Sequence, residues 1–446
     1  MRIAGLIAAS LLSACASYHD ATLPASPDLA VAASRLKIDA SRLRLGPPRA
    51  RRIDPSAGLD PTDVAILAVL NSPDLAAKRA AAKVAAAQAF SAGLLPDPQV
   101  LLSLDVPDHP AGLVSAYGVT RSLDLMSLIT HSTALKAARA SADQADLDLL
   151  WSEWSTAQQA RILAVTVLAD EAKATVLQVI FADLAERYRQ SNLALARGDV
   201  TAVVASADLA AELDARAQLA IALHDAAKAR GDLDALIGLA PTVRLDLVIG
   251  PPLAEPDPAA VDAAVASVAS RRPDLLALRA GYRSQDATLR KAILTQFPLL
   301  NFGYSRQRDT GAVLTNGVTA TVTLPLFNRG RGDIAIQSAT RERLRAEYQA
   351  RLDGAVADVA AARRDLEADR ANLATLEAGK PRLAAVAAQA RIALARGDLD
   401  SAAYLALEQS ALKQQVAIED LRLALGLAEV NLQTVIFLPM SQDVTP

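Results

Sequence analysis

The sequence contains an internal duplication, and this feature constrains the fold more than any other. Landmarks of the first half recur in the second half in the same order, about 200 residues later. The matched pairs are Asp60-Pro61 with Asp257-Pro258, Pro73-Asp74-Leu75 with Pro273-Asp274-Leu275, and Leu195–Asp199 with Leu394–Asp398. This offset is too long for a solenoid repeat of about 20 to 50 residues. The sequence therefore predicts two similar half-molecules, residues 59–250 and 251–438.

Proline placement predicts long helices in each half, because a proline inside a helix costs about 3 kcal/mol. No proline lies between Pro110 and Pro241, and only Pro381 lies between Pro325 and Pro439. We expect long antiparallel helical hairpins over 130–238 and 332–436, with a kink or local break at Pro381. The first helix would be about 90 to 100 Å long. Aromatic residues make up only 3% of the chain while hydrophobic residues make up 52%, which favours closely packed helices over a compact globular core.

Four short segments alternate with a period of two and predict β-strands. They lie near 98–107 and 113–124 in the first half and near 299–307 and 316–326 in the second. In the last of them, Thr319, Thr321 and Thr323 alternate with apolar residues. One apolar and one polar face suit a membrane-spanning barrel with a wet lumen, and these threonines are the candidate lumen residues. The alternative is a pair of surface hairpins that cover the ends of a helical bundle.

Four strands are too few to close a barrel in a membrane. Known spanning barrels begin at about eight strands, and an open edge in lipid leaves backbone groups unpaired. The barrel interpretation therefore predicts that several chains share one barrel.

The N-terminus reads as an export signal. Arg2 precedes an apolar run that is too short to span a bilayer. Leu12-Ser13-Ala14-Cys15 resembles the lipobox of bacterial lipoproteins, and Cys15 is the only cysteine of the chain. We expect a lipoprotein signal peptide over 1–14, a lipidated linker over 15–58 and a C-terminal tail over 439–446. An ordinary signal peptide with a chance cysteine is the alternative.

In its duplicated halves, its order of elements and its Leu324–Gly330 segment, the chain resembles the TolC family of outer-membrane efflux proteins. The resemblance implies a mainly α fold with a small transmembrane β part, in which a homotrimer forms a twelve-stranded barrel above a periplasmic α-helical tunnel. It implies a periplasmic adaptor protein and an inner-membrane efflux pump as partners. It also implies lipid anchoring in the outer membrane of a Gram-negative bacterium, with the lipid on Cys15 as the only expected cofactor.

The two Arg-Gly-Asp turns are candidates for the periplasmic tip, where the family docks its adaptor and constricts its channel. The candidate residues for adaptor contact or gating are Arg197, Gly198, Asp199, Arg396, Gly397, Asp398, Asp400 and Tyr404. The plain alternative is that each glycine only permits the chain to reverse. Some family members carry gate aspartates six and nine residues after the tip glycine. Those positions hold Val204, Ala207, Ala403 and Ala406 here, so we do not expect that kind of aspartate ring.

Other classes of function find little support in the sequence. The formal charge of −3 gives no electrostatic case for nucleic-acid binding. No phosphate-binding glycine loop or nucleophile constellation is present, so we expect no enzyme, no catalytic residue and no metal site. A passive efflux channel is the preferred function, and the short predicted loops resemble the heavy-metal branch of the family, which makes metal cations one candidate substrate. The alternatives are an outer-membrane channel for type I protein or polysaccharide secretion and a non-conducting periplasmic coiled-coil scaffold.

Overall fold

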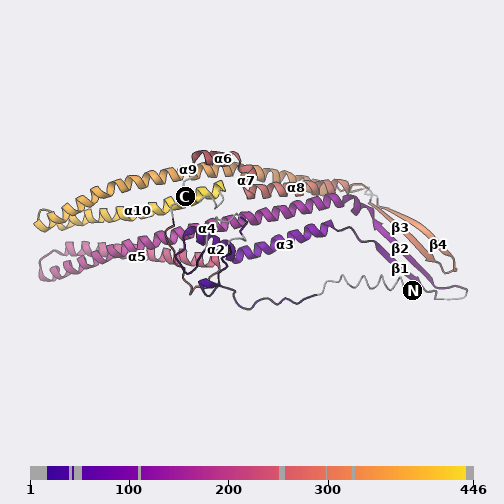
Figure 1. The fold of residues 1–446 in the computed structure, drawn as a ribbon, viewed down its shortest axis with the longest axis horizontal. Coiled ribbons are helices and arrows are strands. Elements are labelled where there is room, and N and C mark those ends of the chain that lie inside the picture. The colour runs from indigo at the N-terminus through magenta and orange to yellow at the C-terminus, as the bar shows by residue number, and fades with distance from the viewer. Residues whose placement is uncertain are drawn as a thin grey trace.

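The structure is an elongated molecule with helical turns at one end and a β-sheet at the other (Figure 1). It is a computed structural model that describes residues 18–39, 43–44, 53–108, 112–250, 257–297, 299–323 and 327–437. The candidate lipidation site Cys15, the signal segment 1–14 and the tail 439–446 lie outside the described residues. The predicted fold class, mainly α with four strands in a duplicated arrangement, is confirmed.

The helices follow the same order in both halves. Those of the first half are α2 (Pro61–Asn71), α3 (Pro73–Gly93), α4 (Leu125–Arg197) and α5 (Ala202–Ile237), after a short 3₁₀ turn η1 (Ala33–Arg35). Those of the second half are α6 (Pro258–Ala266), α7 (Val268–Arg271), α8 (Pro273–Leu294), α9 (Arg331–Arg396) and α10 (Ser401–Ile436). The two long helices, α4 and α9, have 73 and 66 residues.

Capping and proline placement explain where several helices begin. The Asp60 carboxylate accepts hydrogen bonds from the backbone N–H groups of Thr62 and Asp63 at the start of α2, and Asp257 does the same for Ala259 in α6. Prolines occupy the first position of α2, α3, α6 and α8. An N–H at this position would have no hydrogen-bond partner within the helix, so proline costs nothing there. The predicted break at Pro381 is absent, because α9 continues through this residue.

Each long helix is flanked by two shorter helices that follow one another along its length. α4 contacts α3 and α5, while α9 contacts α8 and α10. Where α5 meets α3, a Cβ atom on Gly238 would lie 3.2 Å from Cγ of Pro73. Where α10 meets α8, the Arg272 guanidinium donates to the Val435 carbonyl oxygen at 3.4 Å. We call the region of these two junctions the waist.

The four strands form one antiparallel sheet in the order β1-β2-β3-β4. The strands are β1 (Gln99–Asp105), β2 (Ala116–Asp124), β3 (Leu299–Arg308) and β4 (Leu314–Thr323). The fourth strand thus begins two residues before the predicted range, and the end of that range, 324–326, lies outside the described residues. β2 and β3 pair across the two halves, so the sheet joins the repeats and leaves β1 and β4 as its edges.

The main hydrophobic core lies at the waist and is built mostly by the first half. Val64–Val69 of α2 are almost completely buried, together with Trp154 and Ala157 of α4. The N-terminal segment joins this core, since Ala30 and Leu59 form isolated β-bridges with Leu239 and Leu247. In the part of the chain that the structure describes, no helix combines the length and the apolar character needed to cross a bilayer.

Candidate functional site

The polar face of the sheet is hollowed. Cross-strand pairing places Gln99, Ser122, Gly303 and Thr319 in one row across all four strands. These residues and their neighbours line the hollow, which is bounded by Pro96, Asp97, Gln99, Thr120, Ser122, Asp124, Asn301, Gly303, Thr319 and Thr321. Two of the three candidate lumen threonines, Thr319 and Thr321, therefore lie in a concave polar surface. Thr323 pairs with Leu299 at the end of β4.

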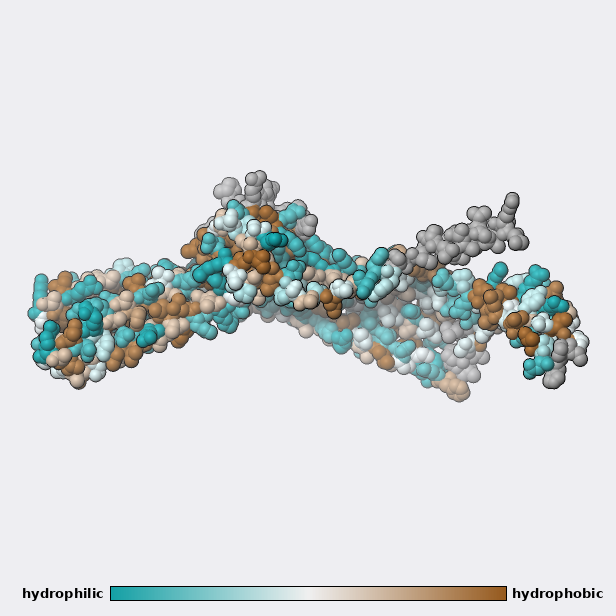
Figure 2. All heavy atoms as spheres, turned by 90° about the horizontal axis from the view of Figure 1, so that it is seen from below, coloured by the Kyte–Doolittle hydropathy of each residue, from teal (hydrophilic) through white to brown (hydrophobic). Residues whose placement is uncertain are grey.

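The opposite face of the sheet is apolar and exposed. Leu102 of β1 and Val318 of β4 each have 71% of their surface exposed, and Phe302 of β3 has 50%. Figure 2 shows hydrophobic residues at the sheet end of the molecule. Soluble proteins rarely leave such a contiguous apolar face uncovered. A wet concave face and an apolar outer face are the two surfaces that a membrane barrel strand presents.

The two helical tips have the same backbone structure. Gly198 and Gly397 have φ values of 82° and 76°, in the left-handed region that favours glycine. At each tip the aspartate after the glycine donates its N–H to a carbonyl five residues earlier, Ala194 or Ala393, at 2.9 Å. This is a Schellman ending, and the duplication thus extends to individual hydrogen bonds.

The side chains of the tip residues are exposed and lie close to their own turns. Arg197 forms an ion pair with Asp199 at 3.0 Å. Arg396 and Asp398 are exposed. The Asp400 carboxylate accepts a hydrogen bond from the Ala403 N–H at 2.8 Å, in the first turn of α10. Adaptor contact or gating at these residues stays a prediction.

A cluster that the sequence analysis did not find joins the two hairpins near the tips. Arg187 of α4 lies 2.9 Å from the Asp208 carboxylate of α5 and 2.7 Å from the Glu408 carboxylate of α10. The Tyr404 hydroxyl also donates to Glu408, at 3.1 Å, and the Arg187 guanidinium lies 5.0 Å from the Tyr404 ring centre. We call these four residues the tip latch. Tyr404 is thus buried against the other hairpin, with 8% of its surface exposed.

α9 reaches the tip latch as well. The Arg391 guanidinium donates a hydrogen bond to the Tyr404 hydroxyl oxygen, and this contact raises the pKa of Arg391. All four helices of the two hairpins therefore contribute to one polar cluster. A second contact between the hairpins, Lys173 of α4 with Asp420 of α10 at 2.7 Å, lies closer to the waist.

The sequence spacing around Gly198 could have indicated the contact of Arg187 with Asp208. Arg187 and Asp208 are about equally far from Gly198 in the sequence, so an antiparallel hairpin places them opposite one another. No such rule connects Arg187 with Glu408, because their contact depends on how one hairpin packs against the other.

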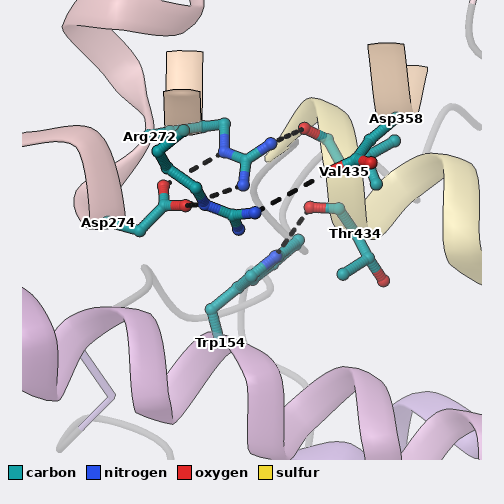
Figure 3. Close-up of polar contacts among 7 residues, drawn as sticks. Trp154, Arg272, Asp274, Asp358, Thr434 and Val435 are labelled. Atoms are coloured by element: carbon teal, nitrogen blue, oxygen red, sulfur yellow. Dashed lines mark hydrogen bonds and ion pairs between the residues drawn. The ribbon is translucent and has the colours of Figure 1, made fainter. Parts of the chain in front are cut away.

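At the waist, a buried charge cluster holds the second junction together. Arg272 and Arg351 both contact the Asp274 carboxylate at 2.7 Å, and Arg272 lies 5.0 Å from the ring centre of Trp151. Figure 3 shows Arg272 between Asp274 and the Val435 carbonyl, with the Trp154 indole nitrogen donating to Thr434. These contacts connect α4, α8, α9 and α10, so this cluster positions helices.

Burial and charge act in opposite directions on the Asp274 carboxyl. Burial alone would raise its pKa, but the hydrogen bonds and positive charges of Arg272 and Arg351 outweigh burial and lower the pKa below its ordinary value. Asp274 is therefore ionised in the folded protein at neutral pH.

Comparison with known proteins identifies first the fold and then the family. The fold matches the outer-membrane channel OprN at 18% identity and a TM-score of 0.72, over 95% of this chain and 99% of that one. The Campylobacter jejuni outer membrane channel CmeC matches at 14% identity and a TM-score of 0.72, over 95% and 94% of the two chains. CusC, described in terms of folding and transmembrane channel formation, matches at 14% identity and a TM-score of 0.71, over 95% and 99%.

Residues 264–436 match the family model described as outer membrane efflux protein. A comparison with curated proteins gives no significant match. The resemblance predicted from the sequence is confirmed. The matched family and these structures are channels and not enzymes. Among the described residues, no group of three or more His, Cys, Asp and Glu is placed to hold a metal ion.

Proposed function

We propose that this protein is the outer-membrane channel of a tripartite efflux system. The observation that carries the proposal is the two-faced sheet, with a hollowed polar side and an exposed apolar side. In this function the polar side faces a water-filled lumen and the apolar side faces lipid. The channel is passive, and an inner-membrane pump supplies the energy.

A homotrimer would satisfy the open edges of the sheet. β1 and β4 each have a neighbour on one side only, and an unpaired edge in lipid costs several kcal/mol for each unsatisfied group. Pairing β4 of one chain with β1 of the next closes a barrel, and three chains of four strands give twelve strands, within the known range of spanning barrels. The helices beneath would then form a tunnel through the periplasm.

The tip latch is the proposed gate of this tunnel. Opening the tunnel requires one hairpin to move away from the other, and Arg187 holds α4 to α10 through Glu408. Both side chains are partly buried, with 21% and 17% of the surface exposed, so their ion pair is less screened than a surface pair. The Arg-Gly-Asp turns beside the latch are the proposed contact for a periplasmic adaptor, which would favour the open arrangement.

Exchange of Arg187 for Gln tests the gate. Loss of the positive charge releases Glu408 and Asp208 from their shared partner, so we expect a larger mean single-channel current in planar bilayers. Arg189→Gln is the matched control, because Arg189 pairs only with Glu186 of its own helix and both side chains are more than half exposed. Equal currents for wild type and the Arg187 variant would remove the latch from the proposed mechanism.

Lipid attachment at Cys15 would anchor the chain to the outer membrane, as proposed from the lipobox-like sequence before it. A lipid on Cys15 would add to the attachment that the barrel supplies. Metabolic labelling with a fatty acid tests this step, and Cys15→Ser should abolish the label without abolishing the barrel.

For the substrate we propose metal cations, on the resemblance of the short strand-connecting loops and the Leu324–Gly330 segment to the heavy-metal branch. A strain that lacks the gene should become sensitive to metal ions, with recovery when the gene is returned. Sensitivity to dyes and antibiotics in place of metals would reassign the substrate. Sensitivity to neither, with bilayer currents intact, would favour the secretion alternative, whereas absence of currents would favour a non-conducting scaffold.

A further inference from the structure

Charge is segregated between the two faces of the sheet. The strands carry three arginines, Arg121 of β2 and Arg306 and Arg308 of β3, and two carboxylates, Asp105 of β1 and Asp124 of β2. Register places the arginines on one face, since Arg121 pairs with Tyr304 and Val100, and Arg306 with Val119. The carboxylates lie on the other face, since Asp105 pairs with Ala116 and Asp124 with Asn301.

The arginines share the apolar face. The direct strand neighbours of Arg306 are Val119 and Asn316, and those of Arg308 are Tyr117 and Leu314. No carboxylate lies on this face of the described strands, and no ion pair is formed by any of the three arginines within the described residues. Where this face meets lipid, cations without a counter-charge call for an anionic partner from outside the chain.

Their position along the strands restricts what the partner can be. Arg308 is the last residue of β3, next to the loop that leads to β4. Arg306 lies two residues before it, on the same face of the sheet. The long helices begin at the opposite end of the sheet. Under the proposed function, Arg306 and Arg308 therefore face lipid in the membrane half that is distant from the periplasm, whereas Arg121 pairs with Tyr304 near the middle of the sheet. An arginine facing the hydrocarbon centre costs about 2 to 4 kcal/mol, and the cost falls near the interface.

We propose that Arg306 and Arg308 form a binding surface for the phosphate-bearing headgroups of lipids in the outer half of the membrane. Guanidinium groups form bidentate hydrogen bonds with phosphate, and their alkyl stems lie along apolar surface while the charged ends reach the headgroups. Tyr117, the strand neighbour of Arg308, is exposed on the same face, and aromatic rings are enriched at the level of the lipid headgroups. This inference rests on the proposed outer-membrane channel, because only a lipid-facing strand would meet a headgroup.

The test measures lipid binding to the purified full chain in detergent micelles that contain phosphatidic acid or phosphatidylcholine. Bound lipid is counted by native mass spectrometry. Each arginine near an anionic lipid surface contributes a preference of about fivefold, so the variant with Arg306 and Arg308 both changed to Gln should lose most of a preference of about 25-fold for phosphatidic acid. Excess inorganic phosphate should not displace the lipid, because the apolar face also binds the acyl chains.

Two further variants keep the result interpretable. Arg345→Gln with Arg382→Gln, at exposed positions of α9, removes charge outside the sheet and should leave the preference unchanged. Arg306→Lys with Arg308→Lys retains charge and should retain most of it, which controls for damage to the fold. Equal binding of both lipids by wild type, or an unchanged preference in the variant with Arg306 and Arg308 both changed to Gln, would overturn the inference. Because the assay needs no bilayer current, its failure together with normal currents would leave the proposed channel intact.

Discussion

The two halves share a plan but differ in how much surface they bury within the chain. α4 buries residues along its whole length, from Met126 to Ser191, whereas α9 buries only Ala355, Val359, Ala362, Leu366 and Ala390 among its described residues. The main core at the waist is drawn almost entirely from the first half and the N-terminal segment. The first half therefore supplies most of the core of the single chain, and α9 is held with less of its surface buried than α4.

The junctions at the waist differ in the same way. In the first half, Gly238 and Pro73 pack closely and the chain is held by apolar contacts. In the second half, the junction depends on Arg272, Asp274 and Arg351. Loss of one partner from a buried charge cluster leaves the other charge uncompensated, which is strongly destabilising.

Removal of the Asp274 carboxylate should have the largest effect on stability. Asp274→Ala leaves the buried Arg272 without its counter-charge, and we expect a loss of about 3 to 5 kcal/mol in the free energy of unfolding. Chemical denaturation checks this value. Asp262→Ala is the control, because its pair with Arg363 is exposed and should contribute about 0 to 1 kcal/mol. Similar losses in both variants would show that the second junction does not depend on buried charge.

A pair of truncations sharpens the contrast between the long helices. Leu177 of α4 has 1% of its surface exposed and Ile392 of α9 has 50%. We expect Leu177→Ala to cost about 2 to 5 kcal/mol and Ile392→Ala less than about 1 kcal/mol, when both are measured on monomeric chain in detergent. If Ile392→Ala proves equally costly in the monomer, α9 is buried within its own chain and the contrast fails.

Acid should weaken the second junction. The pKa of Asp274 is lowered from its ordinary 3.8, so the stability that its carboxylate provides is complete above about pH 4 and is lost as the pH falls through the lowered pKa. Thermal unfolding followed by circular dichroism from neutral pH to about pH 3 measures this loss. Asp274→Asn, which cannot ionise, should show a smaller loss, and an identical pH dependence in the two proteins would contradict the assignment.

The tip turns should respond alike, and by the smallest amount. Gly198→Ala and Gly397→Ala place a side chain at positive φ where no atom lies within 4 Å, so only backbone strain of about 1 to 2 kcal/mol is expected. Gly231→Ala, inside α5 and also free of contacts, should instead stabilise by up to about 1 kcal/mol. Unequal effects at the two tips would show that one turn has a role beyond reversing the chain.

Much of this architecture could be predicted because it rests on local rules. Prolines and glycines placed the ends of the helices, and a period of two placed Thr319 and Thr321 on one face of a strand. The duplication supplied the pairing of α4 with α5 and of α9 with α10. Pro381 indicated a kink or a local break, and α9 continues through it without a break.

The parts that could not be predicted depend on packing between the halves. The contact of Arg187 with Glu408 spans two hairpins, and that of Arg272 with Val435 joins the ends of α8 and α10. Arg306 and Arg308 continue the period of two in β3 and share a face with Phe302, but their lack of a counter-charge became visible only with the strand register.

Cysteine substitution on neighbouring residues of β4 tests the central claim most directly. Thr321 and Val322 are adjacent in sequence and point to opposite faces of the sheet. With Cys15 replaced by Ser, Thr321→Cys and Val322→Cys are each incorporated into planar bilayers and treated with a charged thiol reagent. We predict that the reagent reduces the current through the Thr321 variant and leaves the Val322 variant unchanged. A block at Val322 without one at Thr321 would contradict the assignment of the polar face to the lumen.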